Sequence, residues 1–244
     1  MGVVTWFPEP GDGAARLICF PYAGGSASVF RDWERSVPPG VEVLAARLPG
    51  RAERWREEPF TSLELLVDAL TEPVKALTDR PFAFFGHSMG AVLAFELSRR
   101  MRRELGVEPV HVFVASCNPP LPDVPMPVLG TLDEPALRAK LADLGLAEEI
   151  MSDEDLMEML LPLVRADLRI ADGYLDRDGE PLTCPLTAFH GKRDPMVSAE
   201  DMAQWSVGTT GPFLLRQVQG AHLFSDDGWR DVLTAVSDEL GVLV

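Results

Sequence analysis

One short segment constrains the fold of this chain more than any other, the run GHSMG at residues 86–90. A four-residue apolar run, Phe82–Phe85, precedes it, and a helical pattern begins directly after it at Ala91. A serine between glycines at this spacing is typical of a sharp strand-to-helix turn that projects the hydroxyl from the carboxyl edge of a sheet. The glycines leave room for strand and helix to approach each other. Ser88 is therefore a candidate nucleophile.

Short apolar runs alternate along the chain with longer helical patterns, which predicts an α/β fold with a mostly parallel sheet and helices on both faces. Most runs are apolar throughout, as strands covered on both faces are. The predicted strands are Arg16–Phe20, Val41–Ala46, Phe82–Phe85, Val110–Ser116, Leu186–Phe189 and Phe213–Val218. Outside the long connection described next, three helices are predicted between or after these strands. The first begins at a Thr61/Glu64 capping box, the second runs from Ala91 to about Arg103, and the third runs from about Trp229 to Leu240.

The connection between the fourth and fifth predicted strands is far longer than an ordinary crossover needs. We therefore expect one domain over residues 1–244 with an insertion at about 118–183. The insertion opens with a proline-rich stretch, residues 118–127, and two amphipathic helices should follow, which fit either plain core packing or a separate substructure. Their apolar positions are Leu137, Leu141 and Leu144 in the first helix, and Leu156, Met159, Leu160, Leu163, Val164 and Leu168 in the second.

Composition excludes several classes of partner. The formal net charge of −16 would repel nucleic-acid backbones and anionic membrane surfaces, so neither is expected to bind. The N-terminus lacks a signal-peptide pattern and no long apolar run occurs, which favours a cytoplasmic protein. Cys19, Cys117 and Cys184 are expected to be small buried hydrophobes, and neither a metal ion nor a cofactor is expected.

A serine nucleophile needs a base, and four histidines are available. His222 lies in a loop directly after the last predicted strand, at the sheet edge where Ser88 is expected. Asp194, in the loop after the preceding strand, falls between nucleophile and base in the chain order of such hydrolases and is the expected orienting acid. The alternative for His222 is an ordinary histidine in a surface loop, and the alternative for Asp194 is an aspartate that forms a turn before proline. The other histidines, His87, His111 and His190, are expected to be structural.

When a serine attacks a carbonyl group, the tetrahedral intermediate needs hydrogen-bond donors for its oxyanion. The backbone N–H of Met89, directly after the nucleophile, is one expected donor. The other is the N–H of Ala23, in the loop FPYAGGS after the first predicted strand. A phosphate-binding glycine loop is the rival interpretation of this segment, but no lysine follows the two glycines.

These motifs together resemble those of type II thioesterases, the free-standing editing enzymes of polyketide and non-ribosomal peptide synthases. The similarity runs from about Arg16 to Leu240. The matching segments are FPYAGGS at 20–26, LPGR at 48–51, FGHSMG at 85–90, HGKRDP at 190–195 and GAHLF at 220–224.

The resemblance implies an α/β-hydrolase fold in which the insertion forms a helical lid. It also implies hydrolysis of acyl groups from the phosphopantetheine thiol of acyl or peptidyl carrier proteins. The alternatives are a carboxylesterase or lipase, against which the FPYAGGS loop argues, a thioesterase domain cut from a megasynthase, and a catalytically inactive binding protein. A start at Met1 shortly before the first strand favours a free-standing protein over the megasynthase domain.

An acidic chain and an acidic carrier protein would repel each other, so docking would need a local basic patch or apolar contact. Arg47, Arg51, Arg54 and Arg56 lie in and just after the loop that follows the second predicted strand. One hypothesis is that Arg51 and Arg54 dock the carrier. The alternative is a solvated loop whose arginines are balanced by nearby glutamates.

Overall fold

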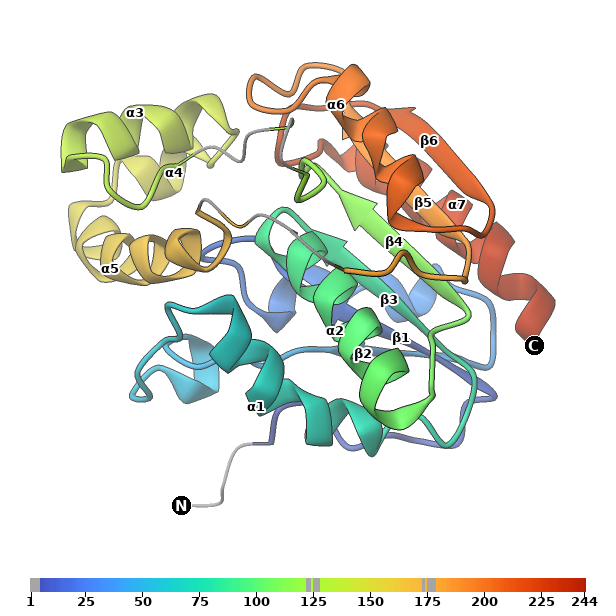
Figure 1. Ribbon diagram of the computed structural model, residues 1–244. Coiled ribbons are helices and arrows are strands. Elements are labelled where there is room, and N and C mark those ends of the chain that lie inside the picture. The colour runs from blue at the N-terminus through green and yellow to red at the C-terminus, as the bar shows by residue number, and fades with distance from the viewer. Residues whose placement is uncertain (1–4, 122–123, 125–127, 173, 175–178) are drawn as a thin grey trace.

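A six-stranded sheet forms the centre of the molecule, which is described by a computed structural model over residues 5–121, 124, 128–172, 174 and 179–244 (Figure 1). The strand order is β2-β1-β3-β4-β5-β6, and every neighbouring pair is parallel. The strands are β1 Ala15–Phe20, β2 Val41–Ala45, β3 Phe82–His87, β4 His111–Ala115, β5 Leu186–Gly191 and β6 Phe213–Val218. All six predicted strands are confirmed, with ends shifted by at most two residues.

Side chains alternate between the two faces of the sheet, so each strand contributes to two separate cores. Phe82 and Phe84 of β3 pack in one core with helices α1, Leu63–Lys75, and α2, Met89–Leu105. Ala83 and Phe85 belong to the other core, which contains helix α7, Asp226–Leu240. The predicted α/β fold with helices on both faces is confirmed.

The helix starts differ from the sequence predictions by a few residues. The Thr61/Glu64 capping box is wrong by one position, because Ser62 is the N-cap of α1 and its Oγ accepts from the Leu65 N–H at 3.5 Å. Helix α7 begins earlier than expected, behind the N-cap Ser225. A short helix that the sequence did not indicate, α6, Ala199–Ala203, follows β5.

The described residues of the insertion between β4 and β5 form three helices, which lie to one side of the sheet (Figure 1). They are α3 Glu134–Asp143, α4 Glu148–Met151 and α5 Glu154–Ala171, and they share a small hydrophobic cluster of their own. Met159 was expected on the buried stripe of α5, but its side chain is 73% exposed. Much of the proline-rich stretch, residues 122–123 and 125–127, lies outside the described residues.

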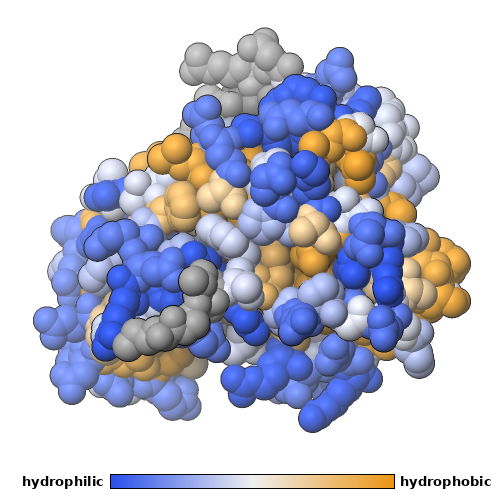
Figure 2. Space-filling view, turned by 90° about the horizontal axis from the view of Figure 1, so that it is seen from below, coloured by the Kyte–Doolittle hydropathy of each residue, from blue (hydrophilic) through white to orange (hydrophobic). Residues whose placement is uncertain are grey.

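Polar side chains dominate the face of the molecule seen in Figure 2, and hydrophobic residues gather there in separate patches. Cys19, Cys117 and Cys184 are buried free thiols, as expected. Across the described part of the chain, no helix is both long and apolar enough to cross a membrane.

Candidate active site

Ser88 occupies the turn between β3 and α2 with strained backbone geometry, φ 53° and ψ −117°. Its N–H donates to the Ala115 carbonyl at 2.8 Å, which fixes the turn to the neighbouring strand. A Cβ on Gly86 would lie 2.0 Å from the Gly90 carbonyl oxygen, and one on Gly90 would lie 2.2 Å from that of Phe20. Only glycine fits at both positions, so the sequence spacing itself produces the sharp turn that exposes the serine hydroxyl.

Three side chains from three loops form one hydrogen-bonded chain at the carboxyl edge of the sheet. The Ser88 Oγ lies 2.9 Å from His222 Nε2, and His222 Nδ1 lies 2.9 Å from Asp194 Oδ2. With Asp194 ionised, Nδ1 carries the proton and Nε2 is left to accept from the serine hydroxyl. The structure therefore brings together the three residues that the sequence singled out and orients them as nucleophile, base and acid require.

Asp194 is held in place by its own loop as well as by the histidine. Its Oδ1 accepts from the N–H groups of Met196 and Val197 at 2.9 and 3.2 Å. Burial on its own would raise the pKa of Asp194, but the hydrogen bonds from His222 and from these two N–H groups hold that pKa below its ordinary value. His190 Nε2 lies 3.0 Å from the Val197 carbonyl and so supports the same loop.

His87 is a structural histidine, as expected, and its hydrogen-bond partner lies in the loop that carries the expected base. Its Nε2 donates to the backbone carbonyl of His222 at 2.8 Å, and its ring stacks on Phe224. Burial lowers the pKa of His87 to about 3, so the ring stays neutral and acts as a fixed donor. Its position next to Ser88 was the only sign in the sequence that His87 would contact the loop of His222. His111 contacts Thr187 and Phe113 inside the sheet, as a structural histidine would.

The two expected oxyanion donors, the N–H groups of Met89 and Ala23, come from different segments of the chain. Met89 begins α2, where backbone N–H groups have no acceptor within the helix. Ala23 lines the same cavity as Ser88 and His222. Among the described residues, the Ala23 N–H donates to no protein acceptor.

An apolar cavity of about 210 Å³ extends from Ser88 under the insertion. Ala23, Gly24 and His222 are among its lining residues, but most of the lining comes from the insertion. The insertion residues that line it are Leu129, Leu141, Leu144, Leu146, Ile150, Leu156, Leu160, Val164 and Leu168. Among the described residues, no cluster of three histidine, cysteine or acidic side chains could hold a metal ion there or elsewhere. The cavity suits a hydrocarbon chain attached to a carbonyl at Ser88.

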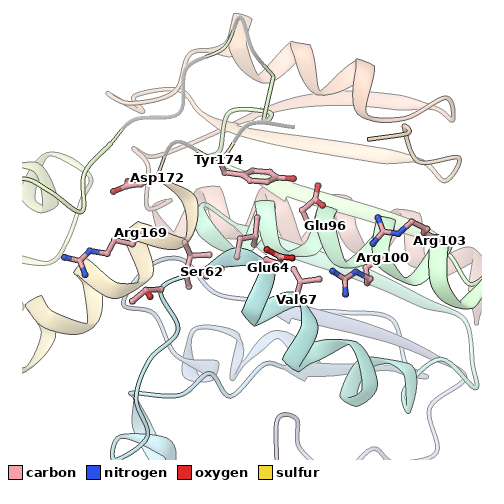
Figure 3. A pocket seen from close by; sticks show the side chains of 12 residues that line it. Ser62, Glu64, Val67, Glu96, Arg100, Arg103, Arg169, Asp172 and Tyr174 are labelled. Carbon is pink, nitrogen blue, oxygen red and sulfur yellow. The ribbon is translucent and has the colours of Figure 1, made fainter. Parts of the chain in front are cut away.

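A larger hollow of about 510 Å³ lies between α1, α2 and the end of α5, and its lining is mostly charged or polar (Figure 3). Its serine, Ser62, caps helix α1. Its Arg100 is paired with Asp68 and Glu104. No histidine is among the described residues that line this hollow, and a serine nucleophile requires such a base.

The carrier-docking hypothesis for Arg51 and Arg54 is wrong, because both residues are only 7% exposed. Arg54 pairs with Glu57, donates to the Arg47 carbonyl at 2.8 Å and lies over the Trp6 ring. Arg51 pairs with Asp167 of α5, a residue to which the sequence analysis gave no role. In the sequence, acidic and basic residues alternate around Arg51 and Arg54, and this pattern does not indicate that the two arginine side chains are buried.

Fold and site together define the class of this protein, an α/β-hydrolase with a serine on the strand-to-helix turn. The model of the thioesterase domain family matches residues 15–240. Thioesterase PikA5 of Streptomyces venezuelae is 38% identical over 237 residues, which cover 96% of this chain and 83% of that protein. Gramicidin S biosynthesis protein GrsT of Aneurinibacillus migulanus is 37% identical over 226 residues, 91% of this chain and 88% of that protein.

A solved structure shows the same likeness in three dimensions. The thioesterase RedJ, from the prodiginine biosynthetic pathway of Streptomyces coelicolor, superposes with a TM-score of 0.89 at 36% identity and covers 98% of this chain and 91% of its own. The chain belongs to the thioesterase family. The resemblance to type II thioesterases of polyketide and non-ribosomal peptide pathways is confirmed.

Proposed function

We propose that this thioesterase hydrolyses acyl groups from the phosphopantetheine thiol of acyl or peptidyl carrier proteins and so clears stalled units from a synthase. The single observation that carries the proposal is the Ser88–His222–Asp194 chain opening into an apolar cavity sized for an acyl group. The relatives named above are biosynthesis proteins or thioesterases of such pathways. The proposal places the enzyme in the cytoplasm, beside the synthase that it serves.

In the first half of the reaction, Ser88 Oγ attacks the thioester carbonyl while His222 Nε2 takes its proton. The carbonyl oxygen becomes an oxyanion between the N–H groups of Ala23 and Met89. The C–S bond then breaks, and the proton on His222 passes to the departing pantetheine sulfur. This step leaves an acyl ester on Ser88.

In the second half, a water molecule gives its proton to His222 and attacks the ester carbonyl. The ester C–O bond to Ser88 breaks, the proton returns from His222 to the serine oxygen, and the free carboxylic acid leaves. Asp194 stays ionised throughout and stabilises the imidazolium that forms twice in each cycle.

The substrate class is tested by comparing one acyl group on three leaving groups, namely a carrier protein, free pantetheine and an oxygen-ester analogue of pantetheine. We expect kcat/KM to be highest for the acyl carrier and lowest for the oxygen ester. The two free substrates serve as each other's control, because they differ only in the sulfur or oxygen atom. Faster hydrolysis of the oxygen ester would identify a carboxylesterase, and no turnover of any substrate would identify an inactive binding protein.

We propose further that the insertion is a lid within the single domain. The Leu223 N–H, next to His222, donates to the Leu144 carbonyl at the end of α3 at 3.0 Å, so the insertion contacts the loop that carries His222. Its helices supply most of the apolar wall around the acyl cavity. We expect this wall to move when an acyl chain attached to a carrier enters the cavity.

Hydrogen exchange tests the lid. Amides of α3 and α4 should exchange faster than those of β3, and they should slow when a tetrahedral acyl analogue binds at Ser88. Helix α7, which packs directly on the sheet, is the internal control and should not change on binding. Exchange in α3 and α4 as slow as in α7, with no response to the analogue, would make the insertion an ordinary part of the core.

A further inference from the structure

Arg51 and Asp167 form an ion pair that is buried behind the active site. Arg51 follows β2, and Asp167 lies on α5 with no exposed surface. The two guanidinium nitrogens lie 2.6 and 2.7 Å from the two carboxylate oxygens, a bidentate arrangement. Burying two charges is costly, and such a pair often stabilises a fold no more than apolar residues of similar size would. The arrangement of its remaining hydrogen bonds indicates another role.

Both members of the pair bond to the loop that carries Ala23. The Gly24 N–H donates to Asp167 Oδ2 at 2.7 Å, and Arg51 donates to the Gly25 carbonyl at 3.0 Å. A Cβ on Gly24, which has φ +79°, would lie 2.7 Å from a methyl group of Val164 on α5. The loop therefore packs against α5, and the ion pair holds it at two consecutive residues, through the Gly24 N–H and the Gly25 carbonyl.

These contacts determine where the Ala23 N–H points. The Gly25 N–H donates to the Tyr22 carbonyl at 2.9 Å and closes the turn. In a planar trans peptide the N–H points opposite to the C=O, so fixing the Tyr22 carbonyl also fixes the Ala23 N–H on the other side of the same peptide. The neighbouring polar groups at Tyr22, Gly24 and Gly25 are thus occupied, and the Ala23 N–H is left for the cavity.

We propose that Arg51 and Asp167 are positioning residues that hold the Ala23 N–H in line with the developing oxyanion. This proposal rests on the proposed hydrolysis through Ser88. An oxyanion donor acts only if it lies within about 2.7–3.1 Å of the position that the charged oxygen takes in the transition state. A loosened loop should therefore weaken binding of the transition state far more than binding of the substrate.

The test replaces both charges together, in the double variant Arg51→Met/Asp167→Leu. This change removes the two bonds to the loop but leaves no unpaired buried charge, so the protein should remain folded with a melting temperature near that of the wild type. We expect kcat for the acyl-pantetheine thioester to fall by roughly 10- to 100-fold and KM to change by less than about threefold. Affinity for a boronic acid, which forms a tetrahedral adduct on Ser88, should fall in parallel with kcat.

Arg16→Met is the matched control. Arg16 is also a buried arginine with carboxylate partners, Glu42 and Asp79, but it lies near the amino end of β1, the end of the strand opposite the site. This variant should lower the melting temperature and leave kcat within about twofold of the wild type. If Arg16→Met lost as much kcat as the double variant, the loss in the double variant would follow from lower stability, and the proposal would be overturned.

Asp167→Asn gives a second measurement if the double variant does not fold. It keeps an oxygen for the Gly24 N–H but loses the charged partner of Arg51, and it should also lower kcat with little change in KM. A wild-type kcat in whichever variant folds would overturn the positioning role. A wild-type enzyme that hydrolyses no thioester would instead overturn the proposed function, so the two failures are distinguishable.

Discussion

Replacing Ser88 by alanine should reduce kcat for an acyl-pantetheine thioester by roughly 10⁴- to 10⁶-fold. Without the hydroxyl, His222 has no nucleophile to activate, and only binding and the two oxyanion donors remain to assist direct attack by water. Substrate binding should persist, because the apolar cavity under the insertion is unchanged. Steady-state rates and the binding of a non-hydrolysable thioether analogue measure the two effects separately.

Covalent labelling identifies the nucleophile independently. A fluorophosphonate should modify the wild type at Ser88, as located by peptide mass spectrometry, and should not modify Ser88→Ala. Ser98→Ala is the matched control, because Ser98 is a buried serine further along the same helix whose Oγ donates to the Ala94 carbonyl at 2.7 Å. This control should keep both labelling and turnover. Labelling of Ser88→Ala, or turnover of that variant near the wild-type rate, would assign the nucleophile to another residue.

The sequence predicted the core of the fold because its signals are local. Each strand is a short apolar run between polar turns, and the alternation of strands with helices implies a parallel sheet. Parallel strands place their carboxyl ends at one edge, so loops after β3, β5 and β6 had to gather there. This rule predicted that Ser88, Asp194 and His222 would lie close together, and in the structure they are within hydrogen-bonding distance. Their catalytic roles remain predictions.

The sequence could not predict contacts that depend on distant parts of the chain. Arg51 and Asp167 are 116 residues apart, and each looks in the sequence like a solvated polar residue. Asp167 lies on an amphipathic helix, where a carboxylate normally faces water, yet α5 packs that face on the loop at Gly24. Met159 shows the converse, since its apolar side chain falls at helical spacing but outside the packed face. The tertiary packing of the insertion determines the burial of Asp167 and the exposure of Met159, and hydrophobic periodicity alone does not predict that packing.

Helix starts were the other weak point of the sequence analysis, for a different reason. Thr61 and Ser62 are adjacent residues that both favour an N-cap, and the choice between them depends on the backbone conformation in which each is held. Ser62 has the extended conformation that a cap needs, with φ −131° and ψ 129°. Such competition between neighbours shifts the end of an element without changing its existence.

Replacing Asp194 by asparagine should lower kcat by roughly 10⁴-fold with little change in KM. The amide oxygen can still accept from the Met196 and Val197 N–H groups, so the loop should keep its shape. The amide nitrogen then faces His222 and donates to Nδ1, which places the imidazole proton on Nε2. A protonated Nε2 cannot accept the proton of Ser88, so the base is present but in the wrong tautomer.

The pH dependence of that loss provides a second check on Asp194. Because the pKa of Asp194 lies below its ordinary value, the wild-type carboxylate is ionised at every pH above that value, and its support for His222 should not vary there. The full loss in Asp194→Asn should therefore be measured at about pH 8, where the wild-type carboxylate is ionised. Asp201→Asn, which changes a carboxylate on α6 in the same crossover, should stay within about threefold of the wild type. A loss of less than about threefold in Asp194→Asn itself would mean that a carboxylate other than Asp194 orients the histidine.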